Sequence, residues 1–468
     1  MHRIIRLIIC FLLLALTTAG AQPSGGGLTP GEMRSRDIFR ELIEINTTVN
    51  NGCTKAAEAM ARRLETAGFD RRDMELAGPG ALHRNLVVRF RGSGWKKPVL
   101  FIGHLDVVEA RREDWSLDPF RFTERDGYFY GRGTNDMKCE DADVVANFIR
   151  LREERFVPDR DIILALTDDE ESGDANGVSW LLANRRPLID AEFSINLEGG
   201  GGDISRGRKV MMEIQTGEKV YISYRMEVKN PGGHSSLPVK ENAIYRLAAA
   251  LTRLAQFDFP PRLNETTRIF FERSALAASG RMKEDMRAIL APSFDTAAGR
   301  RLSDSSAYYN AMMRTTAVAT RLSAGHADNA LPQTASAVVN CRMLPDEDPG
   351  NVLATLARVV ADDSVTITPT GEPFLSPISP LREDVLAAVE SLTRSVWPGV
   401  VVTPVMSTGA SDGRLLRHAG IPVYGVSGMF SDIDDVRAHG RDERIGVREF
   451  YEGVEFMYRF IKTLTSGS

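Results

Sequence analysis

Short apolar segments rich in β-branched residues alternate with amphipathic helical patterns through much of this chain. The helical patterns include residues 36–45, 55–67, 139–155 and 171–184. The candidate strands are residues 85–90, 98–102, 161–167, 193–197 and 423–426. This alternation is typical of an α/β domain with a mainly parallel central sheet. We therefore predict such a domain for residues 30–216 and 376–468.

The middle of the chain follows a different order. From about Gly217 the pattern indicates a strand, a helix, two strands, a helix and a strand, interrupted by a helical stretch over residues 283–315. Without the interruption, this is the order of a split βαβ, or ferredoxin-like, α+β domain. We therefore predict that residues 217–375 form a smaller domain inserted into the larger one.

The first 21 residues have the pattern of a secretory signal peptide. A basic start precedes an apolar run over residues 7–16, and Ala19-Gly20-Ala21 supplies small residues for cleavage. The apolar run is about half of the ~20 residues that span a bilayer, which argues against an uncleaved anchor. We expect an exported protein, periplasmic or secreted, that keeps no membrane segment after cleavage of residues 1–21.

Charge and cysteine content exclude two classes of protein. The chain has 58 Lys and Arg against 63 Asp and Glu, without the basic stripe of a nucleic-acid-binding protein, so we expect no nucleic-acid partner. Beyond the signal peptide, Cys53, Cys139 and Cys341 are widely spaced and lack the CxxC spacing of a thiolate zinc site. We expect buried thiols rather than a disulfide scaffold.

Three predicted strands lead directly into residues of the kind that bind metals. Strand 98–102 leads to Gly103-His104-Leu105-Asp106, strand 161–167 leads to Asp168-Asp169-Glu170-Glu171, and strand 193–197 leads to Glu198. Ligands of open α/β sheets bind at the carboxyl ends of the strands. Carboxylates crowded there would repel one another without cations, and mixed imidazole and carboxylate ligands suit zinc or another first-row divalent ion.

The chain has enough ligand-type residues to hold two metal ions. One carboxylate would bridge the ions, each ion would take one further carboxylate and one imidazole, and one more carboxylate would deprotonate the attacking water. Two further ligand-type residues occur outside the strand ends: Asp136 in a Gly-rich turn that opens a helix, and His439 in a late polar cluster. The full set is His104, His439, Asp136, Glu171 and Glu198, with Glu170 left over.

Six short signatures resemble those of the dinuclear zinc metallopeptidase family that includes glutamate carboxypeptidase, aminoacylase, acetylornithine deacetylase and succinyl-diaminopimelate desuccinylase. They occur in the family's order and in the predicted structural context, between about Arg36 and Phe460. The signatures are His104-Leu105-Asp106-Val107-Val108, Gly131-Arg132-Gly133-Thr134-Asn135-Asp136-Met137-Lys138, Asp169-Glu170-Glu171, Leu197-Glu198-Gly199-Gly200, Gly232-Gly233-His234-Ser235-Ser236 and His439.

The resemblance implies a zinc-exopeptidase-like domain and a role for each matching residue. His104 and Glu198 would hold one Zn²⁺, Glu171 and His439 the other, and Asp136 would bridge them, with Co²⁺ or Mn²⁺ as possible substitutes. Asp106 would orient the imidazole of His104, and Glu170 would be the general base. The peptide bond after Asp136 is expected to be cis.

The inserted domain is implied to act as a lid and to form a homodimer. His234 would reach the active site of the partner subunit and polarise the scissile carbonyl. Asn329 and Arg342 match the family's substrate-binding pair, in which the guanidinium grips a carboxylate. Residues 262–315 lengthen a connection that is compact in the family, and this extra length could reshape the substrate entrance or the dimer contact.

We therefore predict an exported dinuclear zinc metallohydrolase that cleaves a peptide or amide bond next to a carboxylate-bearing residue, as a carboxypeptidase or dipeptidase. An N-acyl-amino-acid amidohydrolase remains open, because it would use the same metals and the same guanidinium. An exported binding protein on this fold is disfavoured, since a binding protein needs no general base such as Glu170. The chain also lacks a G-x-S-x-G elbow after a strand and an HExxH helix.

Overall fold

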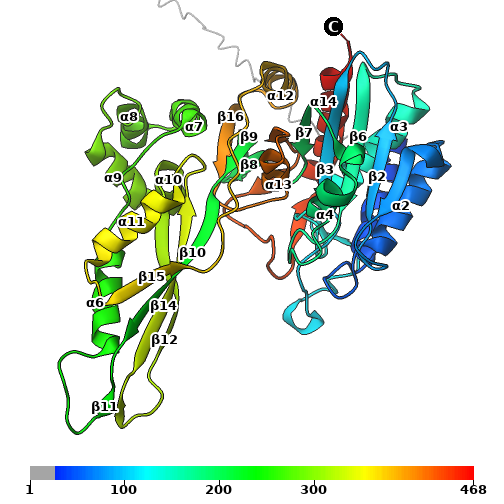
Figure 1. Cartoon of the computed structure of the whole chain (residues 1–468). Coiled ribbons are helices and arrows are strands. Elements are labelled where there is room, and N and C mark those ends of the chain that lie inside the picture. The colour runs from blue at the N-terminus through cyan, green and yellow to red at the C-terminus, as the bar shows by residue number, and fades with distance from the viewer. Residues whose placement is uncertain (1–26, 468) are drawn as a thin grey trace, which may run out of the picture.

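The computed structural model describes residues 27–467 and contains two main sheets (Figure 1). The predicted signal peptide, residues 1–21, lies outside the described residues. One sheet has ten strands, and its strands come from both ends of the described chain. The other has four strands, all from the middle of the chain. Within residues 27–467, no helix is long and apolar enough to cross a membrane.

The ten-stranded sheet is parallel at its centre. Its order is β1-β2-β6-β3-β7-β17-β9-β8-β18, with β16 beside β9, and the central strands β6, β3, β7 and β17 run parallel. The prediction of an α/β fold with a mainly parallel sheet is confirmed. The bounds are β1 Met74–Ala77, β2 Asn85–Phe90, β3 Lys96–His104, β6 Arg160–Thr167, β7 Phe193–Asn196, β8 Gly201–Ser205, β9 Arg208–Glu218, β16 Val401–Ser407, β17 Val423–Gly425 and β18 Phe430–Asp432.

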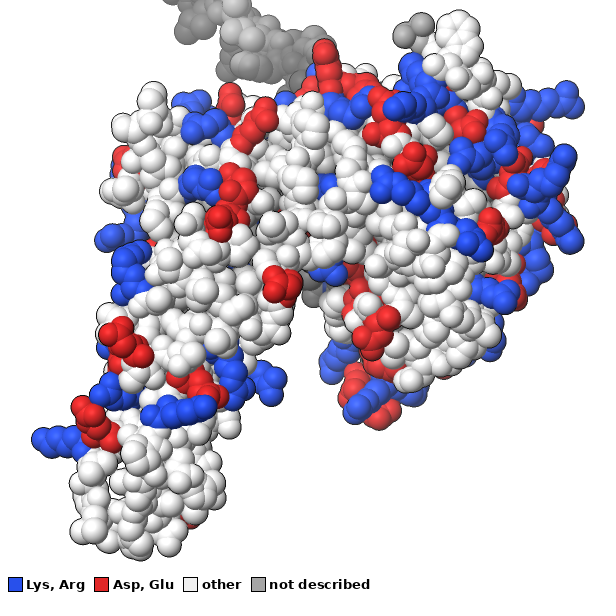
Figure 2. Space-filling view, in the orientation of Figure 1, with Lys and Arg blue, Asp and Glu red and all other residues white. Residues whose placement is uncertain are grey.

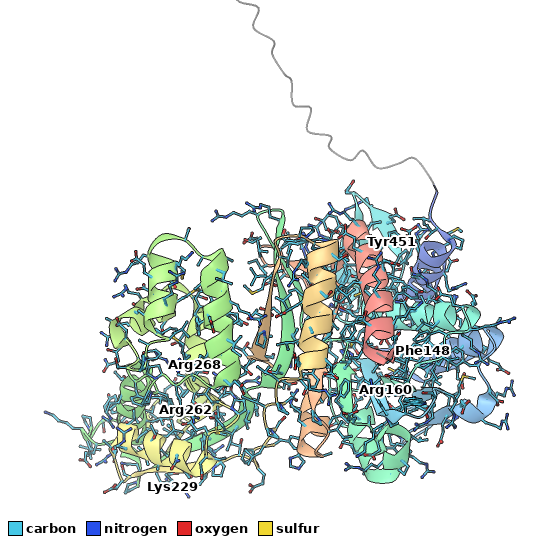
Figure 3. The ribbon with its side chains drawn as sticks, turned by 90° about the horizontal axis from the view of Figure 1, so that it is seen from above. Phe148, Arg160, Lys229, Arg262, Arg268 and Tyr451 are labelled. Carbon is cyan, nitrogen blue, oxygen red and sulfur yellow. The ribbon has the colours of Figure 1, made fainter. Side chains whose placement is uncertain are left out.

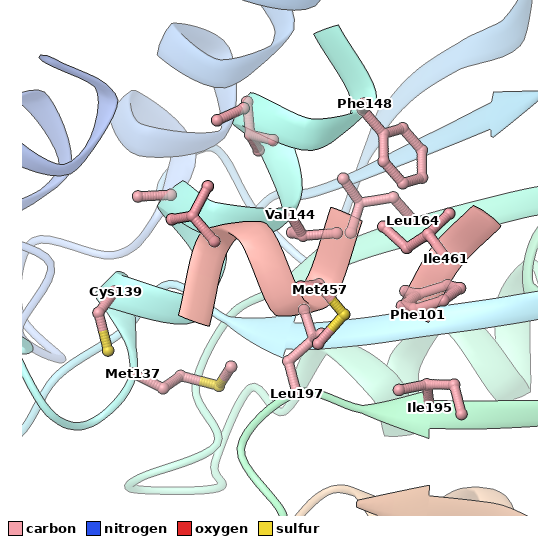
Figure 4. Close-up of a cluster of buried hydrophobic side chains, with 14 of the residues drawn as sticks. Phe101, Met137, Cys139, Val144, Phe148, Leu164, Ile195, Leu197, Met457 and Ile461 are labelled. Carbon is pink, nitrogen blue, oxygen red and sulfur yellow. The ribbon is translucent and has the colours of Figure 1, made fainter. Parts of the chain in front are cut away.

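Helices cover both faces of this sheet. Along β3, Phe101 packs toward one face and its neighbours Leu100 and Ile102 toward the other, which explains the uninterrupted apolar run of this strand. On the first face, side chains of α3 and α14 pack over the strands (Figure 4), and α12 lies beside α14 (Figure 3). That face carries α1 Pro30–Glu44, α2 Thr54–Thr66, α3 Lys138–Glu153, α12 Glu383–Val396 and α14 Val447–Thr465; the other carries α4 Gly177–Asn184, α5 Arg186–Ile189 and α13 Gly413–His418.

The four-stranded sheet is antiparallel throughout, in the order β12-β14-β10-β15. Two helices, α6 and α11, pack on it and enclose a core of its own. The chain order of strand, helix, two strands, helix and strand agrees with the predicted ferredoxin-like pattern. The bounds are β10 Val220–Lys229, α6 Ala243–Ala255, β12 Thr316–Ala324, β14 Thr334–Met343, α11 Pro349–Val360 and β15 Val365–Pro369.

The predicted helical stretch over residues 283–315 is three separate helices, and a fourth helix precedes it in the same connection. They are α7 Glu265–Ala277, α8 Gly280–Ala288, α9 Thr296–Ser305 and α10 Ala307–Met313. Phe270 and Phe271 of α7 share a buried core with Met406 of β16, so these helices pack against the large sheet (Figure 1). Ser306 breaks the stretch between α9 and α10, because its extended backbone ends one helix while its side chain caps the next.

Short strands complete the structure. A two-stranded pair, β11 Gly233–His234 and β13 Ala330–Leu331, lies at the far tip of the small sheet (Figure 1). A second small sheet contains β4 Thr123–Arg125, β5 Tyr128–Tyr130 and β19 Arg444–Gly446. Cys53, Cys139 and Cys341 are buried free thiols, as expected.

Candidate metal centre

Ligand-type side chains meet at the carboxyl edge of the large sheet. His104 is the last residue of β3, and Glu171 and Glu198 follow β6 and β7. Because β3 pairs in parallel with both β6 and β7, the three strand ends lie at the same edge. Side-chain ligand atoms of His104, Asp136 and Glu171 all lie within 4.8 Å of one another.

Asp136 lies between the two imidazoles. Its Oδ1 is 3.3 Å from His104 Nε2, and its Oδ2 is 3.0 Å from His439 Nε2. His439 Nε2 is also 2.9 Å from Glu171 Oε1. Ligands about 2.1 Å from a tetrahedral zinc ion are roughly 3.4 Å apart, so these separations suit shared coordination. Each imidazole faces a different oxygen of one carboxylate, which is the arrangement of a bridging ligand.

Two buried atoms of this cluster have no hydrogen-bond partner among the described residues: His104 Nε2 and Asp136 Oδ1. Buried polar atoms are almost always satisfied by protein, water or an ion. A divalent cation between these two atoms would satisfy both. The residues present therefore fit a metal ion.

Three side chains of the cluster have raised pKa values. Burial raises the pKa of Glu170 to about 8, and the charges of Asp412 and Glu171 add to this rise. Burial, with the charge of Glu170, raises the pKa of Glu198 well above its ordinary value. The hydrogen bonds of Asp136 and Glu171 raise the pKa of His439 to about 10. All three shifts have the same direction, toward the protonated form, which is also the direction in which a bound cation would compensate the carboxylates.

Asp106 holds the turn that carries the two glutamates. Its carboxylate accepts hydrogen bonds from the backbone N–H groups of Glu170, at 3.1 Å, and Glu171, at 3.0 Å. The same carboxylate is 3.5 Å from His104 Nδ1. The sequence suggested only the contact with His104. The structure adds the placement of Glu170 and Glu171.

The helix predicted from residue 171 begins later, at Gly177. Residues 170–176 form a turn, in which the carboxylate of Asp169 accepts hydrogen bonds from Ser172 Oγ and Ala175 N. The side chain of Asn176 then caps α4 by accepting from Ser179 N. This polar turn leaves Glu170 and Glu171 at the sheet edge instead of on a helix.

Glu443, which the sequence did not single out, holds the loop that carries Asp136. Its carboxylate accepts from the backbone N–H groups of Asn135, at 2.7 Å, and Asp136, at 3.1 Å, and pairs with Arg132 at 2.5 Å. Its side chain is fully buried. The only signal in the sequence was its place in the polar cluster that contains His439. The peptide bond between Asp136 and Met137 is cis, as expected.

A second buried network fixes the loop of residues 407–412. Glu218, at the end of β9, accepts from Ser411 N and pairs with Arg417. In the same loop, Asp412 accepts from Asn176 Nδ2 at 2.6 Å. The sequence did not single out Glu218.

The residues expected in the lid lie in two places. His234 and Asn329 are exposed at the far tip, where Ser235 N donates to Asn329 O at 3.0 Å. Arg342 lies near the opposite end of β14, roughly 26 Å along the strand from its first residue, Thr334. One chain therefore does not bring Asn329 to Arg342, nor His234 to the metal cluster. Figure 2 shows an open notch between the tip and the large domain.

The fold and this cluster together define a hydrolase of the metallopeptidase and amidohydrolase class. The chain belongs to the peptidase family M20/M25/M40, whose model matches residues 100–463. The resemblance found in the sequence is confirmed, and the protein is a hydrolytic enzyme.

Relatives and solved structures agree with this assignment. The chain is 30% identical over 376 residues to the N-fatty-acyl-amino acid synthase/hydrolase PM20D1 of Homo sapiens, covering 78% of this chain and 74% of that protein. It is 29% identical over 380 residues to the probable carboxypeptidase S-like 2 of Dictyostelium discoideum, covering 78% and 71%. The crystal structure of the M20 family metallo-carboxypeptidase Sso-CP2 from Sulfolobus solfataricus has a TM-score of 0.67 at 18% identity, over 92% of this chain and 99% of that one.

Proposed function

We propose that this protein is an exported enzyme that uses two zinc ions to hydrolyse an amide bond next to a free carboxylate, in a peptide or an N-acyl amino acid. The observation that carries the proposal is Asp136, whose two carboxylate oxygens face His104 and His439 separately. His104 and Glu198 would hold one ion, Glu171 and His439 the other, and Asp136 would bridge them. The ions would supply positive charge for the scissile carbonyl and lower the pKa of the attacking water.

Glu170 would move the proton in this reaction. It lies next to the ligand Glu171, and Asp106 fixes its backbone through the 3.1 Å hydrogen bond. Its raised pKa suits a group that takes a proton from water and passes it to the leaving nitrogen near neutral pH. A protein that only binds its ligand would have no use for such a group.

His234 would act on the carbonyl oxygen in the active site of a partner subunit. Ser236 N donates to His234 Nδ1 at 3.2 Å, so in the neutral imidazole the proton is on Nε2. An exposed Nε2–H is the donor that a developing oxyanion requires. Its position at the far tip, away from the metal cluster of its own chain, supports a homodimer in which residues 217–375 provide the lid.

Two substrate classes share this chemistry. Carboxypeptidase or dipeptidase activity is supported by the name of the Dictyostelium relative, and N-acyl-amino-acid hydrolysis by the name of the human one. Arg342 would bind the free carboxylate in either case. Export is proposed from residues 1–21 alone, and N-terminal sequencing of the mature protein would test it.

The test of this function is hydrolysis of a panel of dipeptides and N-acyl amino acids of varied acyl length. We expect wild type to cleave some members, to lose activity in a chelator and to regain it with Zn²⁺. Each substrate is paired with its C-terminal amide, which we expect to be a poor substrate. A zinc-loaded protein that cleaves no member of the panel would contradict the proposal.

A further inference from the structure

The two imidazoles of the candidate metal centre are held in different ways. His104 ends β3, and its side chain is 2% exposed. His439 lies in the loop between β18 and β19, residues 433–443, and its side chain is 53% exposed. Within this loop, which we call the His439 loop, only Asp442 and Glu443 are buried. The sheet therefore fixes His104, whereas the position of His439 depends on what holds its loop.

Apolar packing contributes little to holding the His439 loop. Its two large apolar side chains, Ile433 and Val436, are 50% and 75% exposed. Val436 also borders a cavity of about 240 Å³, whose other walls include Ile204 of β8 and Ile445 of β19. A side chain that faces open space has no partner atoms there, and so it gains little dispersion energy. Polar contacts must therefore hold the loop.

The backbone of His439 adds to this requirement. Its φ is 61°, in the left-handed region that residues with a Cβ rarely adopt. Such a conformation costs free energy and persists only where neighbouring groups hold it. Two hydrogen bonds act close by: Arg132 Nη2 donates to His439 O at 3.3 Å, and Gly440 N donates to Arg437 O at 2.8 Å. The second of them makes the turn at His439 depend on the position of Arg437.

Asp435 connects this turn to the sheet. Its Oδ1 accepts a hydrogen bond from Arg437 Nε at 2.8 Å, and its Oδ2 accepts one from Arg444 Nη2 at 2.6 Å. Arg437 precedes His439 by two residues, whereas Arg444 is the first residue of β19. The three side chains of this network are 21% to 37% exposed, so water screens their ion pairs less than it screens a fully exposed pair. One carboxylate thus joins the loop to a strand.

Both guanidiniums have further contacts that fix them. Arg444 pairs with Tyr130 in the register of β19 and β5, and its Nη1 donates to the hydroxyl of Tyr130 at 2.9 Å. Its guanidinium carbon lies 3.8 Å from the ring centroid of Tyr128. On the loop side, Arg437 Nη1 donates to Asp442 O at 3.3 Å, so this arginine also contacts the buried end of the loop. Asp435 is therefore the group through which β19 holds the turn that carries the imidazole.

We propose that Asp435 is a positioning residue, which holds the His439 loop on β19 and thereby places the imidazole that would bind the second zinc ion. In the structure, His439 Nε2 lies 3.0 Å from Asp136 Oδ2 and 2.9 Å from Glu171 Oε1. Without Asp435 the turn would lose its connection to β19, and this alignment would be kept for only part of the time. His104 would keep its place, because β3 carries it. This inference rests on the proposed function, because it concerns one of the two proposed ions.

The test is a titration of metal-free protein with Zn²⁺ in competition with a chromophoric chelator, which measures both dissociation constants. Asp435→Asn keeps the size of the side chain and removes the charge that the two guanidiniums share. We expect one Kd to rise by roughly 10- to 100-fold, the usual effect of losing a group that holds a metal ligand in place, and the other to stay at its wild-type value. Adding Asp435→Asn to His439→Ala should weaken zinc binding no further, because the ligand that Asp435 positions is already gone.

Two further variants complete the test. Asp37→Asn removes the same charge from an exposed aspartate of α1 and should leave both constants unchanged. Arg437→Met breaks the same connection from the loop side, so it replaces Asp435→Asn if that variant fails to fold, with the same selective loss expected. Equal weakening of both ions, or wild-type affinity for both, would overturn the role of Asp435 while leaving the proposed function intact. Wild type that binds fewer than two zinc ions would overturn both.

Discussion

At the residue scale, the proposed function depends on one acidic side chain, Glu170. Glu170 makes no ion pair among the described residues and lies beside the proposed ligand Glu171. It is held in place through its backbone, by Asp106. The side chain is therefore free to carry a proton without a change in the fold.

Glu170→Gln should abolish most of the activity while the metal stays bound. The amide keeps the size of the side chain but cannot accept the proton of the attacking water, so we expect kcat to fall by about 10² to 10⁴. Metal content by elemental analysis and kcat on the best substrate of the panel measure the two effects. A variant that keeps wild-type kcat would remove Glu170 from the reaction. Glu58→Gln, at a partly exposed site on α2 where the side chain pairs with Arg62, is the matched control.

At the element scale, a buried ion pair holds a loop that is not part of any strand or helix. Glu218 and Arg417 are both almost fully buried, and Glu218 also accepts from Ser411. These contacts connect the end of β9 to α13 and to the loop that carries Asp412. The pairing depends on residues 199 positions apart in the chain.

Arg417→Met should destabilise the protein strongly, because it leaves the carboxylate of Glu218 buried without its counter-charge. We expect the free energy of unfolding to fall by about 3 to 5 kcal/mol, measured by urea denaturation. Arg459→Met breaks an exposed pair with Glu455 and should cost less than about 1 kcal/mol. Similar losses in the two variants would show that the buried pair contributes no more than a surface one.

A pair of acids between the large sheet and α10 predicts a pH dependence of stability. Asp203 and Glu213 are diagonal neighbours on β8 and β9, and Tyr308 and Tyr309 of α10 lie near them. Burial, with the charge of Asp203, raises the pKa of Glu213 to about 8, and burial raises that of Asp203 to about 6.

A raised pKa in the folded state means that folding favours the protonated acid. The stabilisation that protonated Glu213 gives the folded state is complete below the pKa of this side chain in the unfolded chain. It is lost as pH rises toward about 8, the pKa in the folded state. We expect Glu213→Gln to gain stability relative to wild type between pH 5 and 8, by roughly 2 kcal/mol at the upper end. Thermal melting of both proteins across this range measures the difference. Parallel pH profiles would mean that Glu213 does not titrate on unfolding.

At the scale of the whole molecule, the proposed homodimer rests on the position of the tip of the small sheet, away from the metal cluster of the same chain (Figure 1). His234 and Asn329 lie together at the tip, while Arg342 lies near the opposite end of β14. The strand β12 is at the edge of the small sheet and is exposed over most of its length. The helices of residues 265–313 pack against the large sheet.

Mixing Glu170→Gln with His234→Ala should restore activity that neither protein has alone. After equal mixing and subunit exchange, about half of the dimers contain one subunit of each variant. If His234 acts in the partner's site, one of the two active sites in such a mixed dimer has both residues intact. About a quarter of wild-type activity should therefore return. Subunit exchange is verified by native mass spectrometry. No recovery after proven exchange would contradict a role for His234 in the partner's site.

Much of this architecture could be predicted from the sequence because its signals are local. Apolar strands buried on both faces and polar residues directly after them identified the central sheet and the candidate ligands His104, Glu171 and Glu198. Asp136 and His439 were identified in a Gly-rich turn and in a late polar cluster. The hairpin of β8 and β9 was missed, since Gly201 and Gly202 interrupt its apolar pattern. Three of the helices of residues 265–313 were merged into one predicted stretch, because their ends depend on caps such as Ser306.

What the sequence determined by itself was the type of fold, the chemistry of the site and the family, each encoded in the spacing of neighbouring residues. Only the tertiary structure decided which side chains hold the site in shape. Glu443 and Glu218 are ordinary acidic residues until folding buries them against loops far away in the chain. The separation of Asn329 from Arg342 is likewise set by the length of β14. Ion pairs between residues far apart in the sequence, and the removal of their side chains from water, exist only in the folded chain. No local sequence pattern therefore predicts them.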